Sequence, residues 1–460
     1  MKRLVFDIEA DNLLWDVANI WCIVTKDIDT LEVKTFEPDE IEEGLAFLSD
    51  ADVLIGHNIQ GYDLPVLKKL YDFDFKGEVW DTLIGSRMLL SRSKQHSLKF
   101  WGEYLERRGM IKSGKQSFHV FTHYTPEMLE YCIQDVEVNY IFFLKGLAKL
   151  DFTHDSVRLE HDIVAIQTES ETFGVSFAYE DAMKLSQDIE LEMDKIRTEV
   201  ETLLGYSWLE KEHYLKNDGE LSKISENLLT KLQREFPQFT HKAVKSSGRC
   251  LIKVPTKITL DTAVLLKEKL LSLGWKCEWK TDKGSLQLTR AGEPEPNLSN
   301  IPGLKDVDIG KYYVLKHRLS IVSGFFKNVR SDGKIPSEAN TLGAITGRYT
   351  HRKIANLPAP RSLYGMEIRS LFGVEEGRVQ IGSDLAGIEA RILAHFMDDA
   401  EFMDDILNGD IHTKTMNRAG LPNRDAAKTF FYATILYGAG DLKSGLLVGG
   451  GKKEGKLMKQ

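Results

Sequence analysis

Strand-like and helix-like segments alternate over residues 1–150, and this order is the strongest constraint on the fold. The hydrophobic pattern predicts strands at residues 2–8, 20–26 and 52–55, and a helix at residues 41–49. Each such element must bury its apolar face against another layer. The segment is therefore predicted to form a mixed sheet flanked by helices, which gives the chain an α/β domain at its start.

The remainder of the chain has a different pattern. Residues 151–204 carry apolar residues at three- and four-residue spacing, which predicts a long amphipathic helix. Residues 205–257 are polar, lysine-rich and irregular, and suggest an inserted or peripheral subdomain. Helix is expected again at 260–274 and a loop at 291–296. Further on, a strand is expected at 379–384, with helices at 388–396 and 424–436.

Composition excludes several classes of protein. With 42% hydrophobic and 28% charged residues, the 460-residue chain is neither disordered nor collagen-like, and its length suggests about three domains. Its apolar runs are too short for a membrane span, and Asp7 lies where a signal peptide would be apolar, so a cytoplasmic location is expected. The four scattered cysteines suggest free thiols. A net charge of −9 argues against indiscriminate nucleic-acid binding but leaves DNA open as a substrate.

A first group of polar residues follows the predicted N-terminal strands. Asp7 and Glu9 share one face of the first strand, where two carboxylates repel each other unless a cation or proton lies between them. A solvated strand edge is the alternative interpretation. Asp63 opens an apolar helix, and Tyr131 and Asp135 lie four residues apart on one side of another helix.

This group resembles the 3′–5′ proofreading exonuclease domain, which has four acidic residues and a tyrosine. The matching residues are Asp7, Glu9, Asp63, Tyr131 and Asp135, and Asn58 before Tyr62-Asp63 also fits the pattern. The resemblance implies a ribonuclease H-like fold for residues 1–150. It also implies that the four carboxylates are catalytic ligands of two divalent ions, Mg²⁺ or Mn²⁺, that neutralise charge on the attacking and leaving oxygens. Tyr131 would then orient the attacking water, because a phenol is a poor general base at neutral pH.

A basic stretch begins a second group of residues. Between residues 343 and 372 five arginines and lysines face a single acid, Glu367. Such an excess suits DNA phosphates, which position a duplex without reading its sequence. Arg348 and Asn356 are the expected DNA-binding residues of this stretch, and a basic surface loop is the alternative.

The segment from Asp384 to Arg391 resembles the first palm motif of family A DNA polymerases, the DNA polymerase I family. The resemblance implies that Asp384 is catalytic and binds both metal ions of a polymerase site, with the backbone of Leu385 adding an oxygen. Glu389 matches the residue whose bulk excludes a ribose 2′-OH. Ala386 stands where the family often has serine.

A helical stripe completes the nucleotide site that this resemblance implies. Arg424, Lys428 and Tyr432 recur every four residues, so that two cations and an aromatic ring can hold a triphosphate and stack a base. His412 matches a further triphosphate contact. An amphipathic helix with incidental basic residues is the alternative for this segment taken alone.

Together these motifs resemble the replicative polymerases of short-tailed bacteriophages. The implied layout is an exonuclease domain at 1–150, a helical thumb at 151–340 with an excursion at 205–257, and a partial palm and fingers of a right-hand polymerase at 341–460. The implied activity is DNA-directed DNA polymerisation with proofreading in DNA replication. Implied partners are primer-template DNA, single-stranded 3′ ends and dNTPs, and the excursion either binds a processivity factor or is purely structural.

Two departures from the family pattern stand out. Tyr437 falls nine residues after Lys428 where the family usually has eight, which turns the helix face by about 100° unless a bulge absorbs the extra residue. No second palm carboxylate motif follows Asp384, since His154-Asp155 and His161-Asp162 both precede it. We therefore expect a polymerase site that a second polypeptide completes, or a chain that acts only as a 3′–5′ exonuclease or as a non-catalytic primer-template binder.

Overall fold

The computed structural model describes the chain except residues 94, 112–120, 217, 238–242, 247–248, 282, 291, 305–306 and 460. The side chains of residues 208, 211, 214 and 246 also lie outside this description. The described chain forms two compact units, residues 1–378 and 379–460, and each is considered by itself. No described helix is long and apolar enough to cross a membrane.

The first unit begins with a five-stranded mixed sheet. Its strands are β1 (Arg3–Ala10), β2 (Ile20–Asp27), β3 (Val33–Phe36), β4 (Val53–Gly56) and β5 (Glu78–Asp81), in the order β3-β2-β1-β4-β5. The pairs β1–β2 and β2–β3 are antiparallel, whereas β1–β4 and β4–β5 are parallel. The predicted mixed sheet is confirmed, and β1 is its central strand.

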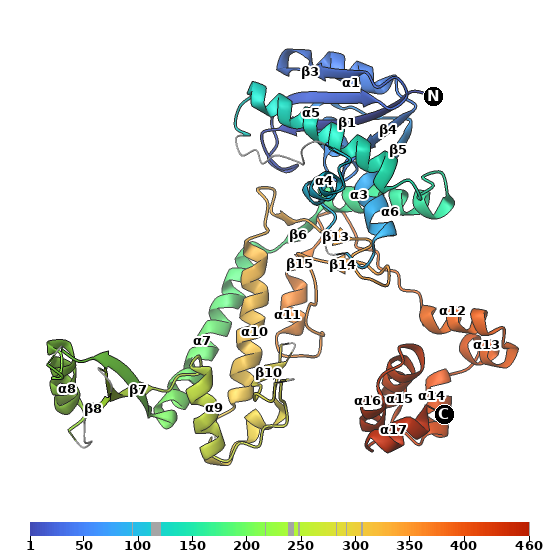
Figure 1. The fold of residues 1–460 in the computed structure, drawn as a ribbon. Helices are drawn as coiled ribbons and strands as arrows, with labels where there is room; N and C mark the ends of the chain where they lie inside the picture. The colour runs from blue at the N-terminus through green and yellow to red at the C-terminus, as the bar shows by residue number, and fades with distance from the viewer. Residues whose placement is uncertain are drawn as a thin grey trace. The chain divides into compact units, whose positions relative to one another are not determined.

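Helices cover both faces of this sheet (Figure 1). Leu4, Phe6 and Ile8 of β1 pack on the face that carries α1 (Ile41–Ser49) and α2 (Asp63–Tyr71). Val5 packs on the opposite face against α5 (Pro126–Ile141). Because side chains alternate along a strand, Asp7 and Glu9 share the α5 face with Val5. The remaining elements of this region are α3 (Thr82–Leu89), α4 (Leu98–Arg107) and the π-helix η2 (Phe142–Gly146).

The single long helix expected over residues 151–204 is wrong, because the chain forms two helices with a strand between them. These are α6 (Asp155–Phe173), β6 (Val175–Phe177) and α7 (Tyr179–Leu204). Gly174 separates α6 from β6 with a φ of +70°, a conformation that ends a helix and that glycine adopts at little cost. Strand β6 then pairs with β12 (Lys334–Ile335) and β15 (Phe372–Gly373) in a small sheet.

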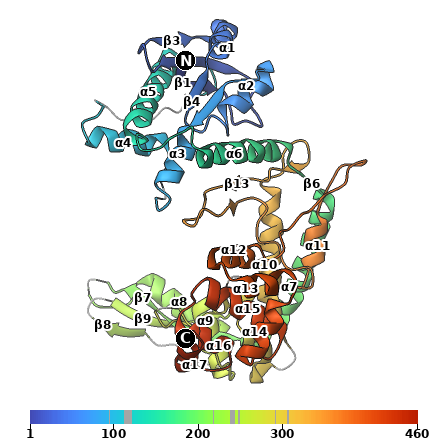
Figure 2. The same ribbon diagram turned by 90° about the vertical axis from the view of Figure 1, so that its right-hand side faces the viewer.

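Helices α7 and α10 (Ile309–Phe326) run side by side and contribute to the largest hydrophobic core among the described residues (Figures 1 and 2). The apolar stripe predicted on α7 is confirmed, since Leu185, Ile189 and Met193 are buried in this core. Helix α9 (Ala263–Ser272) lies within the helix expected at 260–274 and packs against the same core.

Residues 205–257, expected to be an irregular inserted or peripheral subdomain, form a small unit of regular secondary structure. It consists of β7 (Tyr206–Tyr214), α8 (Lys223–Glu235), β8 (Ala243–Ser246) and β9 (Arg249–Lys257). The sheet order is β7-β9-β8, and α8 packs on one face through Leu232, Cys250 and Ile252. The solvated sheet face and the small size of this core explain the polar sequence that concealed the strands.

Short elements connect these parts. Strand β10 (Thr289–Arg290) pairs with β11 (Glu293–Pro294), which lies within the loop expected at 291–296. Residue 291 lies outside the described part of the chain. The other short elements of the unit are η1 (Pro38–Glu40), η3 (Pro296–Asn300), η4 (Pro302–Leu304), β13 (Ala339–Asn340), β14 (Thr350–His351) and α11 (Gly365–Ser370).

The second unit is helical. Its elements are α12 (Ile388–Met397), α13 (Ala400–Leu407), α14 (Ile411–Ala419), α15 (Arg424–Phe430), the π-helix η5 (Phe431–Leu436), α16 (Asp441–Leu447) and α17 (Lys452–Met458). The helices expected at 388–396 and 424–436 are confirmed. The strand expected at 379–384 is wrong: Val379 and Ile381 are 80% and 88% exposed, and no described strand pairs with this segment. A strand needs a hydrogen-bonded neighbour, which local sequence does not reveal.

Gly56 at the end of β4 provides a test of this packing. A Cβ atom at Gly56 would lie 1.9 Å from Ile59 Cγ2, so Gly56→Ala should lower the melting temperature by an amount equivalent to about 1–3 kcal/mol. Gly324→Ala within α10 is the matched control: its Cβ would meet nothing within 4 Å, and alanine should stabilise the helix by about 0.5–1 kcal/mol. Thermal unfolding of both variants measures the difference, and equal shifts would contradict the packing of the segment after β4.

Candidate functional site

Asp7 and Glu9 lie on the central strand of the sheet. Glu9 is only 7% exposed and Asp7 is half-buried, and their partners on β2 are Cys22 and Val24 respectively. Strand β1 pairs with β4 only through residues 3–5, but the burial of Glu9 argues against a fully solvated strand edge at this pair. The two carboxylates therefore lie under α5, where solvent screens their repulsion poorly.

Asp63 joins these carboxylates from the start of α2. Its side chain is 3% exposed, and Oδ1 accepts a hydrogen bond of 3.3 Å from the backbone N–H of Ile8, between Asp7 and Glu9. Burial raises the pKa of the Asp63 carboxyl to about 7, and the negative charge of Asp81 acts in the same direction. Burial also raises the pKa of the neighbouring Tyr62, as do Asp63, Glu9, Asp11 and Asp7. The end of β1 is therefore a strongly acidic environment.

Helix α5 brings the third part of the predicted group to Asp7. Cys132 Sγ lies 3.8 Å from Asp7 Oδ2 and 3.6 Å from the backbone oxygen of Asp7. Cys132 follows Tyr131 directly and precedes Asp135 by one turn, and Asp135 is buried. The predicted residues thus come from three separate segments that meet at β1. Sequence reasoning missed Cys132, which has no motif of its own.

Asp81 is a second residue that sequence reasoning missed, and it supports the loop before Asp63. Its carboxylate accepts hydrogen bonds from the backbone N–H groups of Asn58 at 3.0 Å, Gln60 at 3.2 Å and Leu83 at 2.8 Å. Burial raises the pKa of Asp81, although these hydrogen bonds oppose the shift. An acid that ends an apolar strand just before a helix is an N-cap signal that could have identified it. Asp81 holds Asn58 in place, whose φ is +68°.

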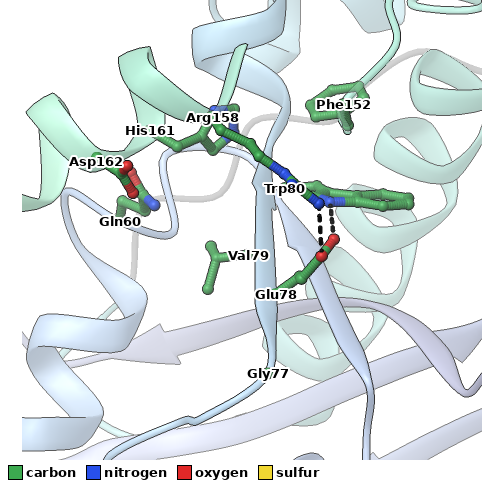
Figure 3. A pocket seen from close by; sticks show the side chains of 9 residues that line it. All are labelled: Gln60, Gly77, Glu78, Val79, Trp80, Phe152, Arg158, His161 and Asp162. Carbon is green, nitrogen blue, oxygen red and sulfur yellow. Dashed lines mark hydrogen bonds and ion pairs between the residues drawn. The ribbon is translucent and has the colours of Figure 1, made fainter. Parts of the chain in front are cut away.

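One cavity of about 300 Å³ lies between β5 and α6, away from the predicted residues (Figure 3). Glu78 accepts hydrogen bonds from Arg158 and from the indole N–H of Trp80, both at 3.1 Å. His161, which also lines the cavity, accepts a hydrogen bond of 2.8 Å at Nε2 from the backbone N–H of Asp81. His161 of the His161-Asp162 dipeptide is therefore a buried support of β5.

In the second unit the predicted nucleotide-binding residues cluster around α15. Arg424 forms two hydrogen bonds with Asp410, from Nε at 2.8 Å and Nη2 at 3.2 Å, and this pairing holds the pKa of Asp410 well below its usual range. The ring of His412 lies 5.8 Å from that of Tyr432. Burial lowers the pKa of His412, and the charges of Arg424 and Lys428 lower it further. Sequence reasoning did not predict that Asp410 pairs with Arg424 in this cluster.

The extra residue before Tyr437 is absorbed by a change of helix type. Residues 431–436 form a π-helix, in which the N–H of Tyr437 bonds to the carbonyl of Tyr432 at 3.0 Å. A π turn holds one residue more than an α turn. Tyr437 therefore lies on the helix face that an eight-residue spacing from Lys428 would give it. Its hydroxyl donates a hydrogen bond to Glu389 on α12. A Cβ at Gly387 would lie 4.0 Å from the hydroxyl of Tyr432, so the Asp384–Glu389 segment borders this helix.

Other predicted residues are exposed. Asp384 and Leu385 lie on the extended segment before α12. Arg348 and Asn356 belong to the first unit, on exposed segments without regular secondary structure, and Asn356 has a φ of +54°. Among the described residues, Asp7, Glu9 and Cys132 form a group whose ligand atoms all lie within 4.8 Å of one another and could hold a metal ion.

Comparisons with known proteins place the whole chain in context. The family model described as DNA polymerase family A matches residues 223–456. The DNA-directed DNA polymerase of Escherichia phage T7 is 28% identical over 562 aligned positions that cover 99% of this chain and 78% of the phage protein. That of Enterobacteria phage T3 is 29% identical with the same coverage.

A solved structure has the same fold. The polymerase domain of Pol1 from M. smegmatis, in complex with primer-template DNA and a dNTP, aligns with a TM-score of 0.63 over 99% of this chain and 71% of that chain. The sequence identity of 16% limits this likeness to the fold. The expected right-hand polymerase fold class is confirmed.

The raised pKa of Asp63 predicts how stability depends on pH. The ordinary pKa of 3.8 applies to the unfolded chain, so between about pH 4 and pH 7 only the folded state holds this proton. Without metal, stability should therefore fall as the pH rises through this interval. Asp63→Asn keeps a carbonyl for Ile8 N–H but removes the charge. In EDTA its melting temperature should exceed that of the parent at about pH 8, and the difference should shrink at about pH 5.

Asp162→Asn is the matched control, because Asp162 is exposed on α6. Its melting temperature should follow that of the parent at both pH values. A stabilisation by Asp63→Asn that is the same at pH 5 and pH 8 would contradict the buried-carboxyl explanation.

Proposed function

Because this chain belongs to DNA polymerase family A and its function is DNA-directed DNA synthesis, we propose that residues 1–150 are its 3′–5′ proofreading exonuclease. The observation that carries the proposal is the convergence of Asp7 and Glu9 beneath α5, which bears Tyr131 and Asp135, with Asp63 hydrogen-bonded to the backbone between the first two carboxylates. The substrates we propose are single-stranded 3′ ends for this domain, and primer-template DNA and dNTPs for the polymerase part. The further division into a thumb at 151–340 and palm and fingers segments at 341–460 belongs to the same proposal.

The residues of the exonuclease site fit a divalent metal. Family A polymerases use divalent ions, and clustered carboxylate oxygens are the donors that Mg²⁺ and Mn²⁺ prefer. Burial raises the pKa of Asp63 because solvent compensates its negative charge poorly. A bound cation would compensate that charge, so the same burial favours cation binding. Two bound ions would neutralise the attacking and leaving oxygens of phosphodiester hydrolysis.

The protein's own groups have distinct roles in this proposal. Asp7, Glu9, Asp63 and Asp135 hold the ions. The hydroxyl of Tyr131 orients the attacking water, and Asp81 keeps the loop that leads to Asp63 in its folded conformation. Asn58, in its left-handed conformation at the start of that loop, is exposed and available to a DNA strand.

For the polymerase part we propose that Asp384 binds the catalytic ions, with an oxygen from the backbone of Leu385. Arg424, Lys428 and His412 would bind the triphosphate, and Tyr432 would stack on the base. Glu389 would exclude a ribose 2′-OH, and its hydrogen bond from Tyr437 holds the carboxylate in one place. Arg348 and Asn356 would contact the primer-template.

The small unit of β7, α8, β8 and β9 is the proposed contact for a processivity factor. Its α8 covers only one sheet face, and Val244 on β8 with its cross-strand neighbour Leu251 lies on the other, where Val244 is 62% exposed. A purely structural excursion is the alternative. Binding of a candidate factor that survives deletion of residues 206–257 would exclude this site.

The exonuclease proposal is tested on a 5′-labelled primer-template in Mg²⁺, with and without dNTPs. The double variant Asp7→Ala, Glu9→Ala should degrade DNA about a hundredfold more slowly or worse, because the ions lose two ligands. DNA binding should persist. Asp384→Ala is the matched control: it should keep the degradation and abolish any extension.

Unchanged degradation in the double variant would overturn the assignment of Asp7 and Glu9. Extension that survives Asp384→Ala would overturn the assignment of the polymerase carboxylate. Extension that requires an added polypeptide would place a further palm carboxylate on that polypeptide.

A further inference from the structure

The thiol of Cys132 is part of the acidic site at β1. Its Sγ atom lies 3.8 Å from Asp7 Oδ2, and the ligand atoms of Asp7, Glu9 and Cys132 all lie within 4.8 Å of one another. We propose that these three residues bind a thiophilic divalent cation of the Zn²⁺ or Cd²⁺ class, which inhibits the exonuclease. The inhibition rests on the proposed exonuclease function, whereas the metal site rests on the geometry alone.

The observed spacing suits shared coordination of one ion. Typical Zn–S and Zn–O bonds of about 2.3 and 2.0 Å at a tetrahedral angle separate the sulfur and oxygen by about 3.5 Å. The sulfur–oxygen distance at Cys132 and Asp7 exceeds this value by a few tenths of an ångström, which a side-chain rotation can supply. On ligation the thiol releases its proton to solvent, and the sulfur becomes an anionic ligand.

The surroundings direct this sulfur toward the carboxylates. Cys132 is fully buried, and the apolar neighbours in its core cluster include Val24 and Val136. Its thiol contacts two oxygens of Asp7 and also forms a side-chain hydrogen bond with Cys22. A weak S–H donor to Asp7 is the alternative role, and serine would fill it equally well. Only a thiolate adds affinity for soft ions.

The exonuclease and polymerase parts should therefore differ in their sensitivity to thiophilic metal ions. All four cysteines of the sequence precede residue 379, so the unit that contains Asp384 has no thiol. A thiophilic ion should therefore inhibit degradation at concentrations that leave any extension largely unaffected. Carboxylates alone bind Zn²⁺ and Mg²⁺ through the same hard oxygens and give less discrimination.

Cobalt binding to the full chain tests the site without reference to activity. After metal removal, Co²⁺ alone should produce a thiolate-to-cobalt charge-transfer band in the parent. Cys132→Ser should lose the band and bind Co²⁺ at least about tenfold more weakly. Cys22→Ser is the matched control: Cys22 forms a side-chain hydrogen bond with Cys132 but does not belong to the group of ligand atoms, so its band should remain. A band that persists in Cys132→Ser, or that depends on Cys22, would overturn the proposal.

If Cys132→Ser does not fold, the site is tested on the parent protein alone. One equivalent of Zn²⁺ is bound, and X-ray absorption identifies the atoms around the ion. One sulfur with oxygen neighbours is expected, and an all-oxygen shell would overturn the proposal. Degradation in Mg²⁺ is then measured with added Cd²⁺, each variant against its own rate. The parent should be inhibited at least about tenfold more strongly than Cys132→Ser. The parent could show the cobalt band while the double variant Asp7→Ala, Glu9→Ala degrades DNA at the parent rate. This result would retain the metal site and reject the exonuclease proposal.

Discussion

The burial of carboxylates at the end of β1 is the constraint on which the N-terminal region depends. A buried carboxylate is costly unless protons, hydrogen bonds or cations compensate it. The backbone provides part of this compensation, since Ile8 donates to Asp63 and three backbone N–H groups donate to Asp81. The raised pKa of both acids shows that the compensation is incomplete. In the proposed exonuclease site a bound cation would complete this compensation.

In the second unit the main constraint is the placement of side chains along one helix. Lys428 and Tyr432 are four residues apart, a spacing that gives one face of an α-helix. Tyr437 is one residue too far along the chain to share that face in a regular α-helix. The π-helix at 431–436 takes up that residue and lets Tyr437 reach Glu389. The geometric cost of an irregular turn is offset by a hydrogen bond that joins α12 to the helix, two elements that are not adjacent in the chain.

Local spacing predicted much of this structure. The two-residue period of β1 placed Asp7 and Glu9 on one face, and the four-residue period of α7 and of Arg424–Tyr432 identified the helices. What sequence could not show depends on tertiary partners. Cys132 and Asp81 acquire their roles only when α5 and β5 meet the rest of the sheet. Residues 379–384 have the composition of a strand but no partner among the described strands, and Gly174 breaks a helix that periodicity alone would continue.

The two sites also prepare for ligands in opposite ways. In the N-terminal region the charges are buried and lack full compensation, so binding of a cation adds an interaction that the fold lacks. In the second unit Arg424 is already paired with Asp410 at the surface. If Arg424 binds a triphosphate as proposed, the phosphates must take the place of the Asp410 carboxylate. Solvent-exposed ion pairs contribute little to stability, so a triphosphate with several negative oxygens can displace Asp410 readily. In that proposal Asp410 orients the guanidinium in the absence of the nucleotide.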